Sequence, residues 1–155
     1  MIEIERKYRV KNTDFLDHCE ISYRICQGYL NSSSERTVRV RTKNEKGYIT
    51  IKGKSNDLGT TRFEWEKEIQ QNEALELLKL CEDFIIEKTR YVVKYNEQLF
   101  EVDVFHGDNE GLIIAELELN DENEFIDLPD WIGEELTGDI RFYNSYLSNH
   151  PYKTW

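Results

Sequence analysis

Apolar and polar residues alternate with a period of two along most of the chain. Alternation of this kind is typical of β-strands that bury one face. Turn-forming segments such as Asn44-Glu45-Lys46-Gly47 separate neighbouring runs, and connections this short favour antiparallel pairing. The pattern predicts eight strands, at residues 2–10, 22–30, 36–43, 47–54, 61–69, 86–95, 98–106 and 112–120.

Helical patterns interrupt the strands in only a few places. Residues that favour helix starts precede apolar residues at helical spacing. Helices are expected after Asn12, after Asn72, from Pro129 through Leu136, and from about Arg141 to Ser148. Helices this few would cover one side of a large antiparallel sheet. The chain is therefore predicted to be α+β and mainly β.

Each predicted strand has one apolar face and one charged face, and the charges sort by sign within strands. Basic residues recur two positions apart as Arg39/Arg41, Lys52/Lys54 and Lys88/Arg90. Carboxylates recur in the same way as Glu3/Glu5, Glu64/Glu66, Glu101/Asp103 and Glu116/Glu118.

A solvated sheet face would explain the charges of any single strand. It explains the whole set less well, because like charges two positions apart on one face repel each other. The arrangement is favourable if the sheet curls into a barrel whose charged face surrounds water and a charged ligand. The sequence therefore predicts a barrel with a charged lumen and helices packed on its outside.

The length and charge limit the remaining choices. The 155 residues fit one domain, residues 1–155, and no linker divides them. The formal net charge of −11 argues against general binding of DNA or of an anionic membrane, but a local basic pocket is compatible with it. No apolar run approaches a membrane span, and the three widely spaced cysteines suit reduced thiols, so a cytoplasmic protein is expected.

The two kinds of charge cluster indicate one chemistry. Arginine and lysine bind phosphate, and carboxylates bind hard divalent cations such as Mg²⁺ or Mn²⁺. Together they describe a metal-assisted phosphoryl-transfer site. The sequence lacks a P-loop, so side chains are expected to hold the phosphates.

The segment Glu3-Ile4-Glu5-Arg6-Lys7 resembles the Glu-x-Glu-x-Lys motif of the triphosphate tunnel metalloenzymes, also called the CYTH superfamily. Further segments match short bacterial members in the same order, including Val38-Arg39-Val40-Arg41, Arg62-Phe63-Glu64-Trp65-Glu66 and Ala115-Glu116-Leu117-Glu118-Leu119. The resemblance covers essentially the whole chain. It implies an eight-stranded antiparallel tunnel that binds a linear triphosphate with one or two Mg²⁺ or Mn²⁺ ions.

The resemblance also assigns roles to residues. The expected metal ligands are Glu3, Glu5, Glu116 and Glu118, with Glu64, Glu66, Glu101 and Asp103 as candidates for a second ion or its waters. The phosphate-binding positions are Lys7, Arg39, Arg41, Lys52, Lys88 and Arg90, with Lys54 and Arg62 as further candidates that could instead be solvated. The expected catalytic residues are Lys7 together with Tyr29, and either Glu116 or Glu118 as the base. Tyr29 could equally be a buried aromatic residue.

The activity implied by the resemblance is hydrolysis of a linear triphosphate. The chain is short, and no segment stands out as a binding site for an organic group, which favours inorganic tripolyphosphate as the substrate. A class IV-type adenylyl cyclase and a nucleoside or thiamine triphosphatase are the alternatives within this family. A non-catalytic polyphosphate- or nucleotide-binding module is an alternative outside catalysis, and a homodimer is left open as the assembly.

Overall fold

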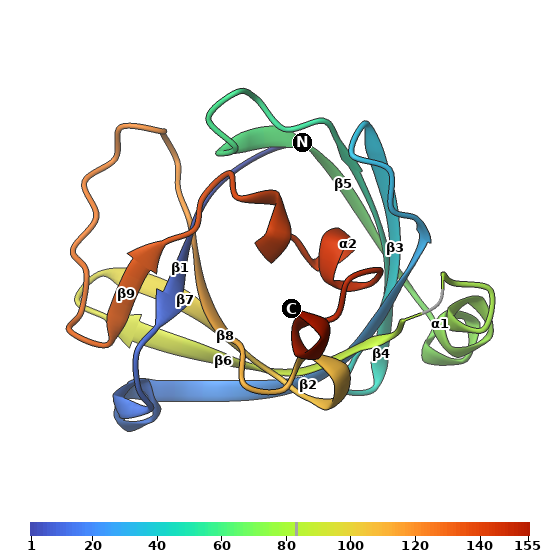
Figure 1. Ribbon diagram of the computed structural model, residues 1–155, viewed down its shortest axis with the longest axis horizontal. Coiled ribbons are helices and arrows are strands. Elements are labelled where there is room, and N and C mark those ends of the chain that lie inside the picture. Colours follow the sequence, from blue (N-terminus) through green and yellow to red (C-terminus); the bar gives the residue numbers. More distant parts are fainter. Residues whose placement is uncertain (83) are drawn as a thin grey trace.

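The computed structural model describes residues 1–82 and 84–155, which form an antiparallel β-barrel around a central lumen (Figure 1). Its wall follows the order β5-β4-β3-β2-β6-β7-β8-β1, and pairing of β1 with β5 closes it. The strands are β1 (Ile2–Val10), β2 (Cys19–Asn31), β3 (Arg36–Lys43), β4 (Lys46–Gly53), β5 (Thr61–Ile69), β6 (Ile86–Tyr95), β7 (Gln98–Phe105) and β8 (Ile113–Glu118). The eight predicted strands and the predicted fold class are thus confirmed.

A ninth strand, β9 (Ile132–Glu135), lies where a helix opened by Pro129 was expected. β5 pairs only with residues 2–4 of β1, so the second half of that edge of β1 needs another partner. β9 supplies it by pairing beside Tyr8 and Val10. The helix prediction from Pro129 through Leu136 is wrong because an open strand edge offers backbone hydrogen bonds that a helix would leave unmade.

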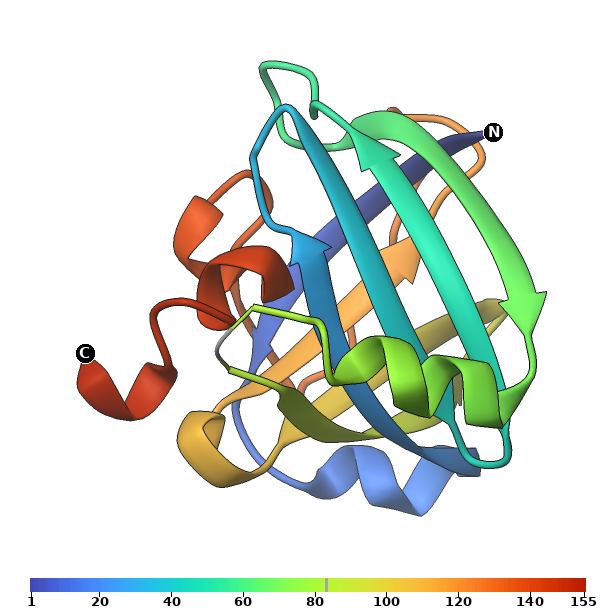
Figure 2. The same ribbon diagram turned by 90° about the vertical axis from the view of Figure 1, so that its right-hand side faces the viewer.

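The helical segments are short, and none in the described residues has the length and apolar character needed to cross a membrane. They are η1 (Asp14–His18), α1 (Gln71–Leu78), η2 (Gly107–Asn109), η3 (Ile140–Phe142), α2 (Asn144–Leu147) and η4 (Tyr152–Thr154). α1 starts at a capping box formed by Gln70 and Glu73 rather than at Asn72. It packs on the outside of β3 and β4 (Figure 2), where Gly47 leaves room for Ala74.

The C-terminal segment differs from the single helix predicted from Arg141 to Ser148. It is split into η3 and α2, and both lie across one end of the barrel (Figures 1 and 2). Phe142 and Leu147 pack there against Ile86, Phe105 and Ile114. These three strand residues share the inward face of their strands with lumen charges, so the inner surface is apolar at this end and attracts the C-terminal segment.

The outer apolar face of the barrel is covered only in part. Phe15 of η1 and Trp131 lie edge-to-face at 5.9 Å between ring centres, and together they cover strands β6 to β8. On β4 and β5, Ile51, Phe63 and Trp65 remain 37%, 43% and 37% exposed. Helices thus pack on the outside of the barrel as predicted, but they leave these three apolar side chains of β4 and β5 partly exposed.

Candidate active site in the barrel lumen

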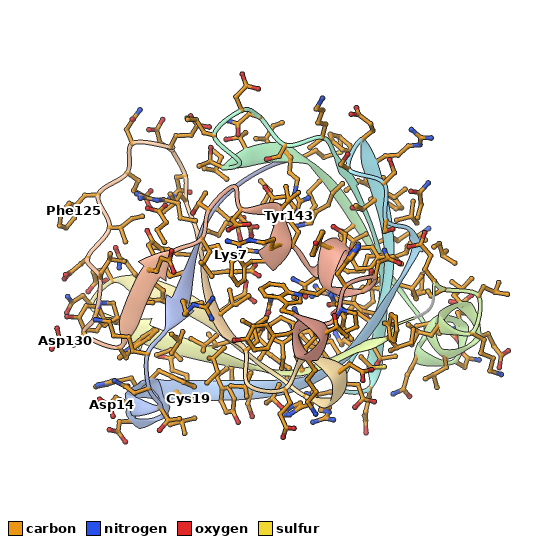
Figure 3. All side chains as sticks on the ribbon, in the orientation of Figure 1. Lys7, Asp14, Cys19, Phe125, Asp130 and Tyr143 are labelled. Atoms are coloured by element: carbon orange, nitrogen blue, oxygen red, sulfur yellow. The ribbon has the colours of Figure 1, made fainter. Side chains whose placement is uncertain are left out.

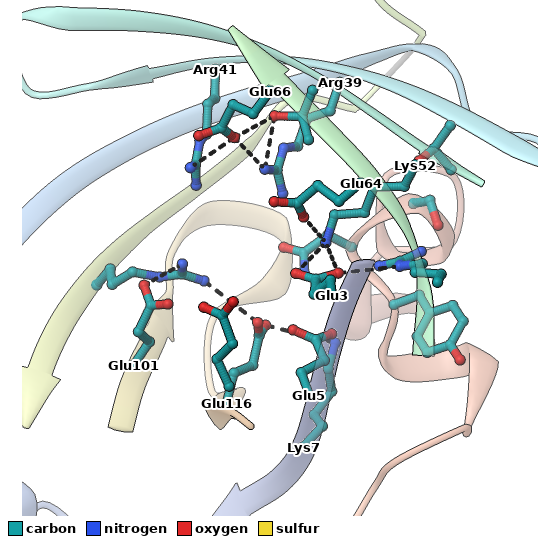
Figure 4. A pocket seen from close by; sticks show the side chains of 18 of the residues that line it. Glu3, Glu5, Lys7, Arg39, Arg41, Lys52, Glu64, Glu66, Glu101 and Glu116 are labelled. Atoms are coloured by element: carbon teal, nitrogen blue, oxygen red, sulfur yellow. Dashed lines mark hydrogen bonds and ion pairs between the residues drawn. The ribbon is translucent and has the colours of Figure 1, made fainter. Parts of the chain in front are cut away.

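The lumen contains a cavity of about 240 Å³ whose lining is almost entirely charged or polar. All of the site residues predicted from the sequence line it, except Lys54 and Asp103: Glu3, Glu5, Lys7, Tyr29, Arg39, Arg41, Lys52, Arg62, Glu64, Glu66, Lys88, Arg90, Glu101, Glu116 and Glu118. Figure 4 shows these side chains converging from opposite strands of the barrel. The period-two pattern of the strands places them there, because every second residue points inward.

Carboxylates dominate one side of the lumen. Glu5, Glu101, Glu116 and Glu118 lie on the adjacent strands β1, β7 and β8, and we call them the acidic wall. Glu5 stands opposite Glu118 in the β1–β8 register, and Glu101 stands opposite Glu116 in the β7–β8 register. Carboxyl groups on neighbouring strands of one face are close enough to repel one another.

Two members of the acidic wall have raised pKa values. Burial, together with the nearby charge of Glu116, raises the pKa of Glu5 to about 7. Burial also raises the pKa of Glu118, and the charges of Glu3 and Glu101 add to it. Within the described chain, neither carboxylate forms an ion pair with a lysine or arginine, so a bound cation would relieve the repulsion between them.

Glu116 has the opposite behaviour. Burial opposes its ionisation, but Lys7 and Arg90 outweigh burial and hold the pKa of Glu116 well below its usual range. Its Oε1 lies 3.7 Å from Nζ of Lys7, and its Oε2 lies 3.9 Å from a guanidinium nitrogen of Arg90. Glu116 is therefore ionised and links the acidic wall to the lumen cations.

Lys7 lies at the end of the lumen that the C-terminal segment covers. Its Nζ donates a hydrogen bond of 3.3 Å to the carbonyl oxygen of Phe142. Burial acts to lower the pKa of Lys7, but Glu116 and Glu5 more than compensate, so the pKa is raised. Lys7 therefore carries a proton that it can donate in a hydrogen bond. Tyr29 is 5% exposed and lines the same cavity from β2.

Cations dominate the other side of the lumen. Arg39, Arg41, Lys43, Lys88 and Arg90 lie on β3 and β6, which flank β2, and we call them the basic wall. Burial, followed by the charges of Arg39 and Arg90, lowers the pKa of Arg41 to about 10. So many cations side by side predict a site for an anion.

Two guanidinium groups of the basic wall lack part of their hydrogen bonding. Arg39 and Arg41 share the carboxylate of Glu66 at 3.6 and 3.3 Å, and Thr50 donates to the same carboxylate at 2.6 Å. The Nε atoms of Arg39 and Arg41 are buried and have no hydrogen-bond partner among the residues described. An unsatisfied buried donor is costly, so the chain's own acceptors satisfy these two guanidinium groups incompletely, and a phosphate in the cavity suits them.

Asp103, on β7, supports the basic wall from behind. It is fully buried behind the cavity, and its carboxylate accepts hydrogen bonds from Lys88 at 2.6 Å and from Arg90 at 2.7 and 2.8 Å. Arg90 also bridges to Glu101 at 2.6 Å. Both oxygens of Asp103 are thus occupied by cations, which suits orientation of Lys88 and Arg90 better than metal binding.

Three further ion pairs link β1, β4 and β5 to one another. Lys52 lies 2.7 Å from Glu3 and 3.0 Å from Glu64, and Arg62 lies 3.5 Å from Glu3 (Figure 4). Lys54 follows the end of β4 and does not reach the lumen. Its side chain is 69% exposed and pairs with Glu35 at 3.3 Å.

The carboxylates of the acidic wall fit a hard divalent cation, because they are oxygen ligands without cationic partners of their own at Glu5 and Glu118. In the part of the chain that the structure describes, however, no three acidic, histidine or cysteine side chains are already gathered closely enough to form a metal site. The donor set fits a hard divalent cation whose remaining ligands come from a bound anion such as phosphate.

The structure adds lumen residues that the sequence analysis missed. Lys43, Thr37 and Thr50 continue the inward parity of β3 and β4, so the period-two rule could have included them. Tyr143, Asn144 and Ser145 also line the cavity, and Figure 3 shows Tyr143 next to Lys7 near the centre of the barrel. No periodic signal marks these three, because their segment is not a strand.

Comparison with known proteins identifies the family. The family model described as the CYTH domain matches residues 1–144. This chain belongs to the CYTH domain family, as the ordered sequence motifs predicted.

Two relatives match nearly from end to end. An inorganic triphosphatase of Acetivibrio thermocellus is 47% identical over 155 residues, covering 99% of this chain and 97% of that protein. An inorganic triphosphatase of Nitrosomonas europaea is 35% identical over 153 residues, covering 96% and 97%. The crystal structure of an inorganic triphosphatase superposes with a TM-score of 0.67 at 33% identity, covering 94% of this chain and 93% of that one. Sequence and fold thus lead to the same group of proteins.

Proposed function

We propose that this protein hydrolyses inorganic tripolyphosphate to pyrophosphate and phosphate with the help of a divalent metal ion. The observation that carries the proposal is the pairing of two incomplete walls in one cavity. Among the described residues, the Nε atoms of Arg39 and Arg41 in the basic wall lack acceptors, and Glu5 and Glu118 in the acidic wall form no ion pair with a lysine or arginine. A triphosphate with its metal ion completes both. The names of the two relatives support the same activity.

In this mechanism the basic wall holds the triphosphate in a line across the lumen. Arg39 and Arg41 bind the phosphate oxygens through guanidinium groups that line the cavity, and Lys88 and Arg90 are kept in position by Asp103. Fixing the chain in this way lowers the entropic cost of bringing water in line with the terminal phosphorus.

Water attacks the terminal phosphorus, and the bond from that phosphorus to the bridging oxygen breaks. Glu118, which lines the cavity, takes the proton from the water. Lys7 donates to the oxygen of the departing pyrophosphate, and Tyr29 faces the same cavity and assists it. Mg²⁺ or Mn²⁺ would be held by Glu5 and Glu116 and would neutralise charge on the phosphate oxygens.

The proposal is tested by measuring phosphate release from the purified protein with Mg²⁺ or Mn²⁺. Tripolyphosphate is compared with pyrophosphate, ATP and thiamine triphosphate. Turnover of tripolyphosphate is expected, and Glu5→Gln should lower it by at least about a hundredfold because one lumen carboxylate is lost. The matched control is Glu97→Gln, in an exposed turn, which should leave turnover unchanged.

The outcomes separate the alternatives. Release from none of the four compounds, with intact folding, would contradict hydrolysis. Formation of cyclic AMP from ATP would indicate a cyclase instead, and tight binding of tripolyphosphate without release at any metal concentration would indicate a binding module.

A further inference from the structure

A second cavity lies directly behind the covered end of the lumen. It measures about 380 Å³ and is formed by the loops after β2 and β4 together with the C-terminal segment. Thr37, Arg62, Tyr143 and Ser145 line this cavity and also the lumen cavity. The two spaces are therefore neighbours that share a partition of a few side chains.

Tyr143 is the largest side chain of that partition. It caps the start of α2 and lies beside two lumen cations, with its ring centre 5.4 Å from Nζ of Lys7 and 5.6 Å from Cζ of Arg62. Figure 3 shows the ring and Lys7 next to each other inside the barrel. An aromatic ring attracts these cations without neutralising them, so both keep their positive charge toward a phosphate placed against the ring.

The partition is anchored by a close contact between two glycines. Gly59 and Gly138 both have left-handed backbone angles, with φ of +73° and +80°. A Cβ atom on Gly59 would lie 2.3 Å from Cα of Gly138 and 3.2 Å from the hydroxyl oxygen of Tyr143. The β4–β5 loop and the C-terminal segment can approach this closely only because both positions are glycine.

The second cavity has a different chemistry from the lumen. The rings of Tyr146 and His150 are stacked in its lining, with centres 4.2 Å apart and planes inclined by 15°. Ile140 adds an apolar side chain, and the cation Lys54 is already paired with Glu35. This lining suits a flat organic ring better than another phosphate group.

We propose that Tyr143 determines substrate specificity by closing the covered end of the lumen against an organic group attached to the triphosphate. This inference rests on the proposed triphosphatase activity and names its substrate class as unesterified triphosphates. A bare tripolyphosphate fits in front of the ring. An ester that enters from this end needs space for its organic group, and that space lies on the far side of Tyr143.

The test compares kcat/KM for tripolyphosphate with kcat/KM for ATP in the wild type and in Tyr143→Ala. The wild type is expected to prefer tripolyphosphate strongly. Removal of the ring joins the two cavities, so the preference should fall by at least about tenfold, because steric exclusion from a pocket is worth factors of this size. Tyr143→Phe keeps the ring and should keep the preference.

The matched control is Tyr146→Ala, which enlarges the second cavity but leaves the partition in place. It should leave the preference unchanged. Circular dichroism melting identifies variants that fail to fold. If Tyr143→Ala fails to fold, Tyr143→Leu is used in its place. An unchanged preference in a folded variant that lacks the ring, or a wild type that hydrolyses ATP as well as tripolyphosphate, would overturn the inference.

Failure of the proposed activity gives a different result. A wild type that hydrolyses neither compound contradicts the hydrolase, but it does not decide the role of Tyr143. In that case, isothermal titration calorimetry compares the affinities for tripolyphosphate and for a non-hydrolysable ATP analogue. A preference of the wild type for tripolyphosphate that falls about tenfold in Tyr143→Ala supports the inference, and equal ratios in both proteins overturn it.

Discussion

The acidic wall and the basic wall are both rows of like charges on neighbouring strands, but they are stabilised in different ways. The basic wall has internal counter-ions, since Asp103 binds Lys88 and Arg90, and Glu66 binds Arg39 and Arg41. In the acidic wall, Glu5 and Glu118 have no cation of their own within the described chain. The difference suggests that the protein builds its anion site in advance, whereas its cation site is completed only when ligands arrive.

The largest effect is expected from removing Asp103, the buried counter-ion of the basic wall. Asp103→Ala leaves Lys88 and Arg90 buried without their shared carboxylate. The free energy of unfolding, measured by urea denaturation, should fall by about 3–5 kcal/mol, the usual cost of breaking a buried ion pair. Glu101→Gln serves as the control, because the Glu101 side chain is 39% exposed, and it should cost much less. Equal effects of the two substitutions would contradict a structural role for Asp103.

Repulsion within the acidic wall should make the stability of the metal-free protein depend on pH. The pKa of Glu5 is about 7 in the folded protein against 4.5 for an ordinary glutamate, so the folded state binds the Glu5 proton more tightly than the unfolded state does. The stability from this proton is complete below pH 4.5 and is lost as the pH rises through about 7, an effect on the order of 3 kcal/mol.

Glu5→Gln should therefore become more stable relative to the wild type between pH 5 and pH 8 in EDTA. Thermal melting measures the effect, and Glu97→Gln is again the exposed control. Addition of Mg²⁺ or Mn²⁺ with tripolyphosphate at pH 8 should raise the melting temperature of the wild type more than that of Glu5→Gln. If the melting temperatures of the two proteins change with pH in parallel, the pKa of Glu5 is not raised in the folded protein.

A smaller change in stability is expected for Arg41, whose Nε has no hydrogen-bond partner among the described residues. Arg41→Met removes a buried cation that repels Arg39 and Arg90, so the ligand-free protein should gain about 1–2 kcal/mol in stability. The same variant should bind tripolyphosphate more weakly, as calorimetry can measure. Arg24→Met, on the exposed outer surface, should change neither quantity. A loss of stability in Arg41→Met would mean that Glu66 already satisfies this arginine.

Most of the barrel and its lumen could be predicted because one rule decides both. A period of two fixes which residues form strands and which of them face inward, so Glu5, Arg41 and Arg90 were predicted together with their strands. The sequence could not show how deep each inward residue lies. Asp103 has the same parity as Glu101, yet it is fully buried by two cations instead of lining the cavity.

The parts that could not be predicted depend on contacts between distant segments. β9 forms because β5 leaves half of an edge of β1 unpaired, and the local sequence around Gly133 does not alternate. Tyr143 reaches the lumen because Phe142 and Leu147 are drawn to an apolar end of the barrel. Lys54 was predicted to bind phosphate because it lies two positions after Lys52. The strand ends at Gly53, however, and the side chain of Lys54 points to solvent.

The narrow junction between β1 and β5 has a consequence for the motion of the barrel. Only three residue pairs join these strands, Ile2↔Phe63, Glu3↔Arg62 and Ile4↔Thr61, whereas β2 and β6 are joined by eight. Local opening follows the weakest set of backbone hydrogen bonds. Amide deuterium exchange should therefore be faster along this junction than between the other neighbouring strands of the eight-stranded wall. Since Glu3 and Arg62 both line the lumen, opening of the junction would displace two residues of the site.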